Sequence, residues 1–356
     1  MGRKGDLRRW KSRRISSKRL RKSLKRLRAG RHTMKPVILS QFGESGLDTV
    51  YLPQVVSLAD RNLHYQLTKT MQELRMAFVA DNEEVRLDFS RTEILHAEGM
   101  LLFYAELTRL IDAFPTKKLS CKPSKKAKVE EVLQHLGVYR LLGHNSLVVP
   151  TSSDAVNWKV ARAVIVDGEK AGKLIEETAQ LSGTAHSKLY RSVSEAITNV
   201  SNHSHLAKRE DGLDLEPTKE WWMFSREEKN SLYVAVCDLG IGIPRSLPRR
   251  HPTEVWLDAI YRMFGDRRTT DGRMIKAALR LRRTRTEEDY RGVGFSDITN
   301  VLHQVEGSLL TVYSNRGKLR YWNPTLIPAI RVRSFKNSIL GTILVWSFPF
   351  RDDQNA

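Results

Sequence analysis

The amino-acid sequence predicts an α/β protein that consists of an N-terminal α/β module and a C-terminal two-layer α/β sandwich. Over residues 62–142, segments with the apolar spacing of a helix alternate with segments that have the apolar spacing of a strand. This alternation favours a mostly parallel sheet. A stretch rich in Gly, Ser, Asn and Pro at 143–158 indicates a domain boundary. After residue 159, two long helical stretches precede a series of strands, which favours helices on one side of a largely antiparallel sheet.

The composition is that of a globular protein. Of the 356 residues, 40% are hydrophobic and 28% are charged, and no apolar run reaches the about 18 residues that a membrane-spanning helix requires. The two cysteines, Cys121 and Cys237, argue against a disulfide scaffold, and no apolar stretch follows the basic N-terminus as in a secretion signal. We therefore expect a cytoplasmic protein without a transmembrane segment.

The positive charge is concentrated at the N-terminus. Residues 1–35 contain 16 of the 60 Lys and Arg residues and a single acid, Asp6, so they carry +15 of the formal net charge of +20. We interpret this segment as a disordered basic tail, because runs of like charge repel one another. The alternatives are a segment that binds nucleic acid and one that docks on an anionic membrane surface or an acidic partner, and Met34 could also be the true start.

The N-terminal module is predicted to span residues 36–145. Residues 36–60 contain four Gly or Pro residues and are expected to be irregular or to form short strands. Beyond them the apolar spacing predicts, in chain order, a helix at 62–78, a strand at 85–90, a mostly buried helix at 97–113, a short strand at 118–122 and a second helix at 125–142.

The C-terminal module is predicted to span residues 160–350, after a linker at 146–159 and before a short tail at 351–356. Its expected elements are helices at 168–181 and 186–205, the strands WWMFS and SLYVAVCD, a long polar segment rich in arginine, a helix at 295–305, and strands near 308–314, 319–322, 329–334 and 340–348.

Three polar residues recur at four-residue spacing within the predicted helix at 186–205. Glu195, Asn199 and His203 therefore project from one helical face. A carboxylate one turn away from a carboxamide suits a phosphate site, because the carboxylate can polarise a water or hydroxyl and the amide oxygen can hold Mg²⁺. Polar residues at this spacing are also common on solvent-exposed helical faces, so the spacing alone leaves both interpretations open.

The apolar strand that ends in CDLGIGIP supplies the second candidate motif. Asp238 stands at the strand end, and Gly240 and Gly242 permit a turn in which the backbone approaches a ligand. A carboxylate acceptor at this position suits the exocyclic amine of adenine. An ordinary strand-to-helix turn is the alternative.

Two further motifs follow. RGVGFSDI has Gly292 and Gly294 directly before a predicted helix, where backbone N–H groups without a nearby Cβ can cradle phosphate. Neither GxxxxGK[ST] nor GxGxxG is present. Gly341 and Thr342 begin the last buried strand, LGTILVWSFPF.

In this order, the motifs VSEAITN, DLGIG, RGVG and the terminal GT strand resemble those of the GHKL ATPase superfamily, which includes gyrase B, histidine kinases, heat-shock chaperones and MutL. The likeness is closest to the anti-sigma-factor serine kinases, whose first motif is similarly followed by a histidine. The resemblance covers roughly residues 160–350. It implies the Bergerat ATP-binding fold, with Mg-ATP held between a helical layer and a lid.

The resemblance also implies a role for each motif residue. Glu195 would be the catalytic base or water-activating carboxylate, Asn199 the Mg²⁺ ligand and Asp238 the residue that binds adenine, with His203 in the ATP-binding set. Gly240 and Gly242 would form the turn beside the base. The backbone amides of Gly292 and Gly294 would belong to the lid at the phosphates, and Thr342 would place a hydroxyl near adenine.

The sequence departs from the family pattern at two places. Leu239 stands where the asparagine after the adenine-binding aspartate is usual, which removes one polar group near the nucleotide. About 25 residues, which we interpret as an extra hairpin, separate SNRG from the GT strand.

The segment VRLDFSRTEILHAEGMLLFYAEL resembles the STAS fold of anti-anti-sigma factors, which usually carry a phosphorylatable serine before a glycine. Here Ala97 and Glu98 precede Gly99, so a fixed charge could imitate a phosphoserine. The alternative is an unrelated α/β module in which Glu98 caps a helix.

Together these features predict an Mg-ATP-binding regulator of the histidine kinase-like ATPase (HATPase) type. It would hydrolyse ATP or phosphorylate Ser or Thr of a partner protein and thereby switch a protein interaction. One alternative is a nucleic-acid-associated GHKL ATPase that uses the basic tail and closes as a homodimer. Another is a non-catalytic ATP sensor.

Overall fold

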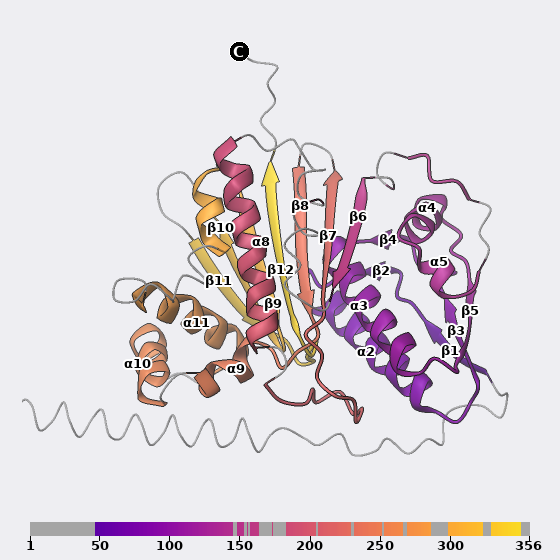
Figure 1. The fold of residues 1–356 in the computed structure, drawn as a ribbon, viewed down its shortest axis with the longest axis horizontal. Helices are drawn as coiled ribbons and strands as arrows, with labels where there is room; N and C mark the ends of the chain where they lie inside the picture. Colours follow the sequence, from indigo (N-terminus) through magenta and orange to yellow (C-terminus); the bar gives the residue numbers. More distant parts are fainter. Residues whose placement is uncertain are drawn as a thin grey trace, which may run out of the picture.

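The computed structural model describes residues 47–144, 148–152, 155, 157–163, 173, 183–203, 206–228, 231–250, 253–265, 269–285, 298–322 and 329–349. These residues form a mixed α/β structure (Figure 1). Four predicted features lie wholly or almost wholly outside the described residues: the basic tail at 1–35, nearly all of the helix at 168–181, the lid glycines Gly292 and Gly294, and the C-terminal tail at 351–356. Within the described part, no helix is both long and apolar enough to cross a membrane.

The N-terminal module contains a parallel sheet of three strands. These are β1 (Leu47–Tyr51), β3 (Glu84–Asp88) and β5 (Lys118–Lys122), with β3 in the middle. A shorter parallel pair joins β2 (Val55–Val56) to β4 (Ile94–Leu95). Helices lie between successive strands of the larger sheet along the chain, which is the connection that parallel pairing requires.

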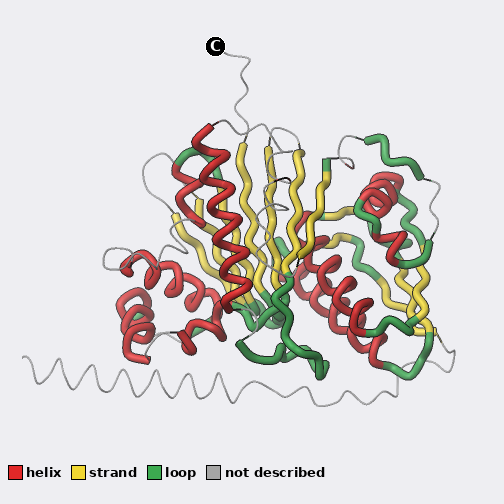
Figure 2. The backbone as a smooth tube through the Cα atoms, in the orientation of Figure 1, coloured by secondary structure: helices red, strands yellow, loops and turns green. Residues whose placement is uncertain are grey.

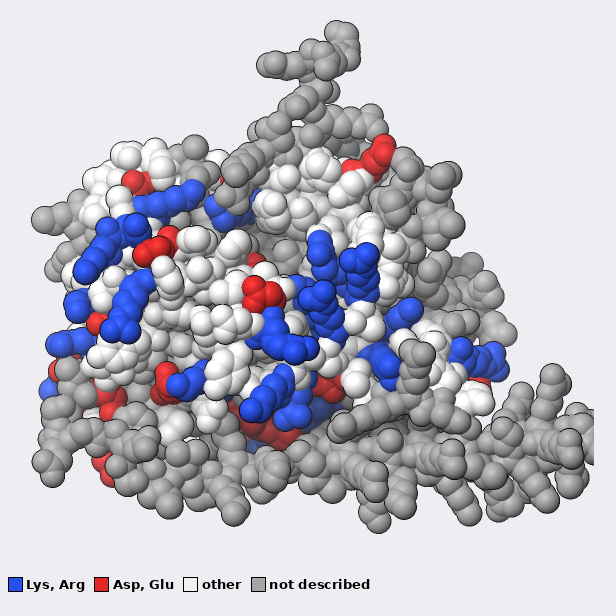
Figure 3. Space-filling view, turned by 180° about the vertical axis from the view of Figure 1, so that it is seen from behind, with Lys and Arg blue, Asp and Glu red and all other residues white. Residues whose placement is uncertain are grey.

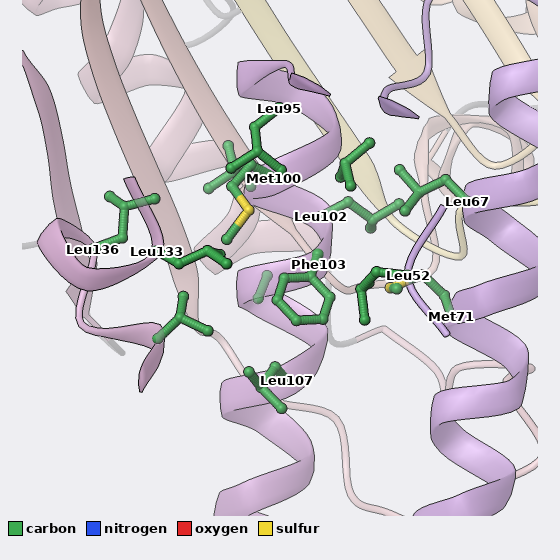
Figure 4. Close-up of a cluster of buried hydrophobic side chains, with 14 of the residues drawn as sticks. Leu52, Leu67, Met71, Leu95, Met100, Leu102, Phe103, Leu107, Leu133 and Leu136 are labelled. Atoms are coloured by element: carbon green, nitrogen blue, oxygen red, sulfur yellow. The ribbon is translucent and has the colours of Figure 1, made fainter. Parts of the chain in front are cut away.

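The helices of this module follow the apolar spacing of the sequence. The predicted helices at 62–78 and 97–113 are α2 (Arg61–Val79) and α3 (Ala97–Ala113). The single helix predicted at 125–142 is instead two, α4 (Ala127–His135) and α5 (Val138–Leu141), because Gly137 between them adopts a left-handed conformation with φ of 73°. Apolar side chains of α2, α3 and α4 meet in one core (Figure 4).

The C-terminal module contains a fully antiparallel sheet of seven strands in the order β11-β10-β9-β12-β8-β7-β6. Its strands are β6 (Trp158–Ala163), β7 (Trp221–Glu228), β8 (Ser231–Asp238), β9 (Leu309–Ser314), β10 (Gly317–Trp322), β11 (Ala329–Ser334) and β12 (Thr342–Pro349). β10 and β11 form the extra hairpin that the sequence predicts, and they extend the sheet beyond β9. β9 and β12 therefore remain neighbours despite the insertion.

Both faces of the seven-stranded sheet are covered by helices (Figure 2). In β7, Trp221 and Met223 belong to the hydrophobic cluster beneath α8 (Gly183–His203), whereas Trp222 and Phe224 belong to the cluster that includes α3. Because successive side chains of a strand point to opposite faces, the unbroken apolar run at 221–224 serves both layers. The C-terminal elements thus form an antiparallel sheet with α8 and α11 on one face, and elements of the N-terminal module pack on the second face.

The segment after β8, which the sequence predicted to be a long polar stretch, contains three helices. They are α9 (Ile243–Arg250), α10 (Thr253–Phe264) and α11 (Asp271–Arg285). Through Ile275 and Leu279, α11 packs against the sheet on the same side as α8. The prediction was wrong because the many arginines of 267–285 obscured the apolar positions at helical spacing between them.

Candidate functional site

Three polar side chains meet at one end of the seven-stranded sheet. Asp238, the last residue of β8, lies opposite Thr342, the first residue of β12, and Thr342 lies opposite Ser314, the last residue of β9. Directly opposed residues of antiparallel strands lie about 5 Å apart on the same face. The oxygen Oγ1 of Thr342 is 3.0 Å from Oγ of Ser314. The strand register alone therefore brings one carboxylate and two hydroxyl groups together.

The turn after β8 is tied to the end of β9. The backbone N–H of Gly240 donates to Oδ1 of Asp238 at 2.8 Å, and the backbone N–H of Ile243 donates to Oγ of Ser314 at 2.8 Å. Gly242 has φ of +74°, and a Cβ there would lie 2.6 Å from Nδ2 of Asn315. Asn315 in turn donates from Nδ2 to the carbonyl of Ile241 at 2.9 Å. Gly242 is thus required both by its backbone conformation and by close packing.

Asp238 is buried, with 8% of its surface exposed. Burial raises the pKa of Asp238 to about 6, although hydrogen bonds from Gly240 and Thr342 and the positive charge of Arg209 lower it. At neutral pH most of the population is therefore an ionised carboxylate that has lost most of its contact with water. A further hydrogen-bond donor would stabilise such a buried carboxylate.

The start of β12 approaches the end of β8 closely. A Cβ on Gly341 would lie 2.2 Å from the carbonyl oxygen of Asp238, so no other residue fits there without a shift of the backbone. The preceding residue is held by the buried Arg209, whose Nε donates to the carbonyl of Leu340 at 2.6 Å. The same guanidinium donates to both carboxylate oxygens of Glu106 on α3, at 3.0 and 2.6 Å. The site is therefore anchored to the N-terminal module.

Glu195 and Asn199 lie on α8, as the spacing predicts. Nδ2 of Asn199 donates to the backbone carbonyl of Glu195 at 2.7 Å and to Oε1 of its side chain at 2.8 Å. Both residues are half-buried, beside the apolar stripe of α8 that includes Ile197 and packs on the sheet. These bonds use the amide nitrogen, and a side-chain amide oxygen is a chemically suitable ligand for a hard cation. The C-terminal half of α8 lies toward the end of the sheet where β8 ends (Figure 1).

The structure thus brings four of the predicted residues into one group: Asp238, Gly240, Gly242 and Thr342. It joins Glu195 to Asn199 on the helix that covers the same sheet. His203 ends α8, but its side chain lies outside the described residues, as do Gly292 and Gly294.

Sequence reasoning missed two residues at strand ends and one buried arginine. Ser314 and Asn315 hold the turn after β8, and Arg209 holds the start of β12. Asn315 has φ of 51°, so the SNRG motif could have indicated a left-handed turn. No local pattern marks Arg209, because Glu106 and Leu340, the partners that place it at the site, lie more than 100 residues away in the chain.

The leucine that departs from the family pattern has a structural explanation. Leu239 is 8% exposed and belongs to the hydrophobic cluster that contains α3 and β7 residues such as Phe103 and Trp222. A polar asparagine at this position would have to lose its hydration against that apolar surface. The contact with the N-terminal module therefore favours leucine at position 239.

Glu98 lies in the first turn of α3 and has a structural partner. Its Oε1 accepts from the hydroxyl of Ser57 at 2.7 Å and from the backbone N–H of Leu58 at 3.2 Å. A Cβ on the neighbouring Gly99 would lie 2.5 Å from the carbonyl oxygen of Val56. These contacts favour the interpretation of Glu98 as a residue that fixes the helix start against the preceding loop.

Among the described residues, no group of three or more His, Cys, Asp or Glu side chains is arranged to hold a metal ion. No protein-family model matches the chain, and neither a curated protein nor a solved structure matches it.

Proposed function

We propose that this protein binds Mg-ATP in the manner of the GHKL superfamily and uses it to switch a protein interaction, by hydrolysis or by phosphorylation of a partner. The C-terminal module would be a Bergerat-type ATP-binding domain and the N-terminal module a STAS-like one. The observation that carries the proposal is the buried carboxylate of Asp238, opposite Thr342 at one end of the sheet on which the helix with Glu195 and Asn199 packs.

The residues present fit the nucleotide chemically. The carboxylate of Asp238 lacks contact with water and has a raised pKa, so a donor such as the exocyclic amine of adenine would compensate its burial. Gly341 lets the start of β12 approach the end of β8 closely, and Gly242 permits the turn after β8 to pack against Asn315. The amide oxygen of Asn199 is a hard ligand of the kind that Mg²⁺ prefers. Gly292 and Gly294 remain the predicted phosphate-binding amides.

Glu195 would supply the proton chemistry. Mg-ATP supplies a phosphoryl group that can be transferred. The bond from Asn199 fixes one oxygen of the Glu195 carboxylate, and the carboxylate can take the proton of a water or of a partner's hydroxyl group. A group that accepts this proton is needed for turnover but not for nucleotide binding.

Replacement of Glu195 with glutamine is therefore expected to lower turnover by at least about 100-fold, while the Kd for ATP changes little. The measurement is release or transfer of label from γ-labelled ATP, alone and with a cell lysate, alongside ATP binding by calorimetry. Glu306→Gln is the matched control, since Glu306 is exposed and is not one of the proposed ATP-binding residues.

The destination of the label distinguishes the possible activities. Free phosphate indicates an ATPase, and labelled partner protein indicates a kinase. If the wild type binds ATP without any turnover, the protein is an ATP sensor. If Glu195→Gln retains full turnover, Glu195 is not the group that accepts the proton.

ATP affinity is expected to fall in acid. Asp238 accepts from adenine only when it is ionised, and its pKa in the free protein is about 6. ATP would therefore bind about 10-fold more weakly for each pH unit below about 6 and almost independently of pH above 7. Calorimetric titrations over this range measure the profile, and in Asp238→Asn this dependence should vanish. A flat profile in the wild type would contradict the assignment.

A further inference from the structure

The exposed face of the β10–β11 hairpin carries three arginines and one tryptophan. Arg320 lies directly opposite Arg331, and Arg333 lies one residue pair further along the same face. On the opposite face of β10, Leu319 points into the hydrophobic cluster beneath α8. All three arginine side chains are exposed. We call the surface formed by these arginines and Trp322 the basic sheet face.

This face lies on the side of the sheet that α3 covers elsewhere. The N-terminal helix α3 packs on β7, β8 and β12, and the hairpin extends the sheet beyond it. Seen from behind, Lys and Arg side chains gather over this part of the molecule (Figure 3). The start of α2 borders the surface, because Lys318 donates to the carbonyl of Ala59 at 2.6 Å and His64 stacks on Phe335 at 4.0 Å.

Among the described residues, the positive charge on this face exceeds the negative charge near it. In the described part of the chain, Arg320, Arg331 and Arg333 form no ion pair with a carboxylate. The carboxylates that face the surface, Glu98 and Asp60, interact with the neighbouring Lys318. Burial, together with the charges of Arg320 and Arg333, lowers the pKa of Lys318 to about 8 in spite of both acids. Like charges held together in this way attract an anionic ligand.

Trp322 adds an aromatic surface to the charges. It is half-buried at the end of β10, and the guanidinium of Arg331 lies 5.1 Å from the centre of its ring. Arginines two residues apart on one strand are separated by about 7 Å. Single-stranded nucleic acid is bound by this combination, in which guanidinium groups contact the backbone and a planar ring stacks on a base.

We propose that the basic sheet face binds single-stranded nucleic acid through Arg320, Arg331 and Arg333, with Trp322 as a stacking platform. An acidic protein would satisfy the charges but would not need the aromatic ring, which is why nucleic acid is favoured. The surface lies on the side of the sheet opposite α8, so the proposal does not depend on ATP binding.

The test uses the full-length protein and a fluorescein-labelled oligothymidylate, with binding followed by fluorescence anisotropy at several salt concentrations. The variant Arg320→Gln/Arg331→Gln/Arg333→Gln is compared with Lys125→Gln/Arg91→Gln/Arg140→Gln, which removes the same charge from exposed positions of the N-terminal module. The first variant is expected to bind at least about 10-fold more weakly. Its salt slope should fall by about 2, since each lost phosphate contact on a single strand contributes about 0.7.

A second readout separates this surface from the basic segment at 1–35. Photo-crosslinking of an iodouracil-containing oligonucleotide is expected to label the peptide that contains Trp322, and Trp322→Phe should retain binding whereas Trp322→Ala weakens it. Equal affinity and equal salt slope in the two triple variants would overturn the proposal. Cross-links confined to residues 1–35, or a preference for duplex DNA, would also overturn it. A third contradicting result would be that the three arginines are needed to bind oligoglutamate but not to bind oligothymidylate.

Discussion

Replacement of Asp238 with asparagine is expected to weaken ATP binding by about 10- to 150-fold. This range corresponds to the about 1.5–3 kcal/mol that a hydrogen bond to a charged group contributes in a buried site. Asparagine has the same shape, and its oxygen can still accept from the N–H of Gly240. It loses the second acceptor oxygen that adenine would use. The Kd for ATP, measured by calorimetry at pH 7, checks the prediction.

The stability of this variant distinguishes a loss of binding from a loss of fold. Because burial raises the pKa of Asp238, the ionised carboxylate costs folding free energy at neutral pH, and a neutral side chain removes that cost. The urea midpoint of Asp238→Asn should therefore equal or exceed that of the wild type. Asp214→Asn, at an exposed position, is the control. If Asp238→Asn folds normally and binds ATP with unchanged affinity, the nucleotide site has been assigned to the wrong residues.

Elements with a clear periodicity could be predicted from the sequence. The helix at 97–113 and the strand at 118–122 have the predicted bounds, because each follows one apolar spacing and ends at a change of pattern. The hairpin between SNRG and the GT strand was also predicted and is confirmed as β10 and β11. Helices α9 to α11 were missed, and in α11 the apolar positions are interrupted by arginine.

The site could be predicted only where one motif contains the whole arrangement. Glu195 and Asn199 are one helical turn apart, and Asp238 and Gly240 belong to one turn, so spacing was sufficient. The hydroxyl of Ser314 reaches Thr342 only because β9 and β12 pair across the inserted hairpin. The apolar run of α3 indicated a buried helix. It did not indicate that α3 also packs on the seven-stranded sheet, because those strands lie more than 100 residues further along the chain.

The buried carboxylate of Glu106 links the two modules, and its removal is expected to cause the largest loss of stability. Glu106 is fully buried on α3 and contacts three arginines, Arg75, Arg109 and Arg209. Asp211 is the second acid of this cluster, paired with Arg109 at 2.8 Å. Glu106→Gln would leave three buried guanidinium groups with one carboxylate. Breaking a buried ion pair in this way costs about 3–5 kcal/mol.

The pH dependence of unfolding identifies the charge as the cause. Burial alone would raise the pKa of Glu106, but the charges of Arg209 and Arg75 outweigh it and lower the pKa from 4.5 to about 2. A lowered pKa means that the stabilisation is fully present above pH about 4.5 and is lost as the pH falls toward about 2. Urea midpoints measured across this window should therefore fall steeply in the wild type and less steeply in Glu106→Gln.

A compensating variant tests whether the surplus positive charge is what destabilises the protein. Glu106→Gln combined with Arg75→Met removes one guanidinium together with the carboxylate, and is expected to recover part of the lost free energy of unfolding. Arg209 should keep its bond to the carbonyl of Leu340 in this double variant, so ATP binding should be retained. If Glu106→Gln is as stable as Glu306→Gln, the cluster does not hold the modules together. If the double variant is no more stable than Glu106→Gln, lost packing rather than unpaired charge is the cause.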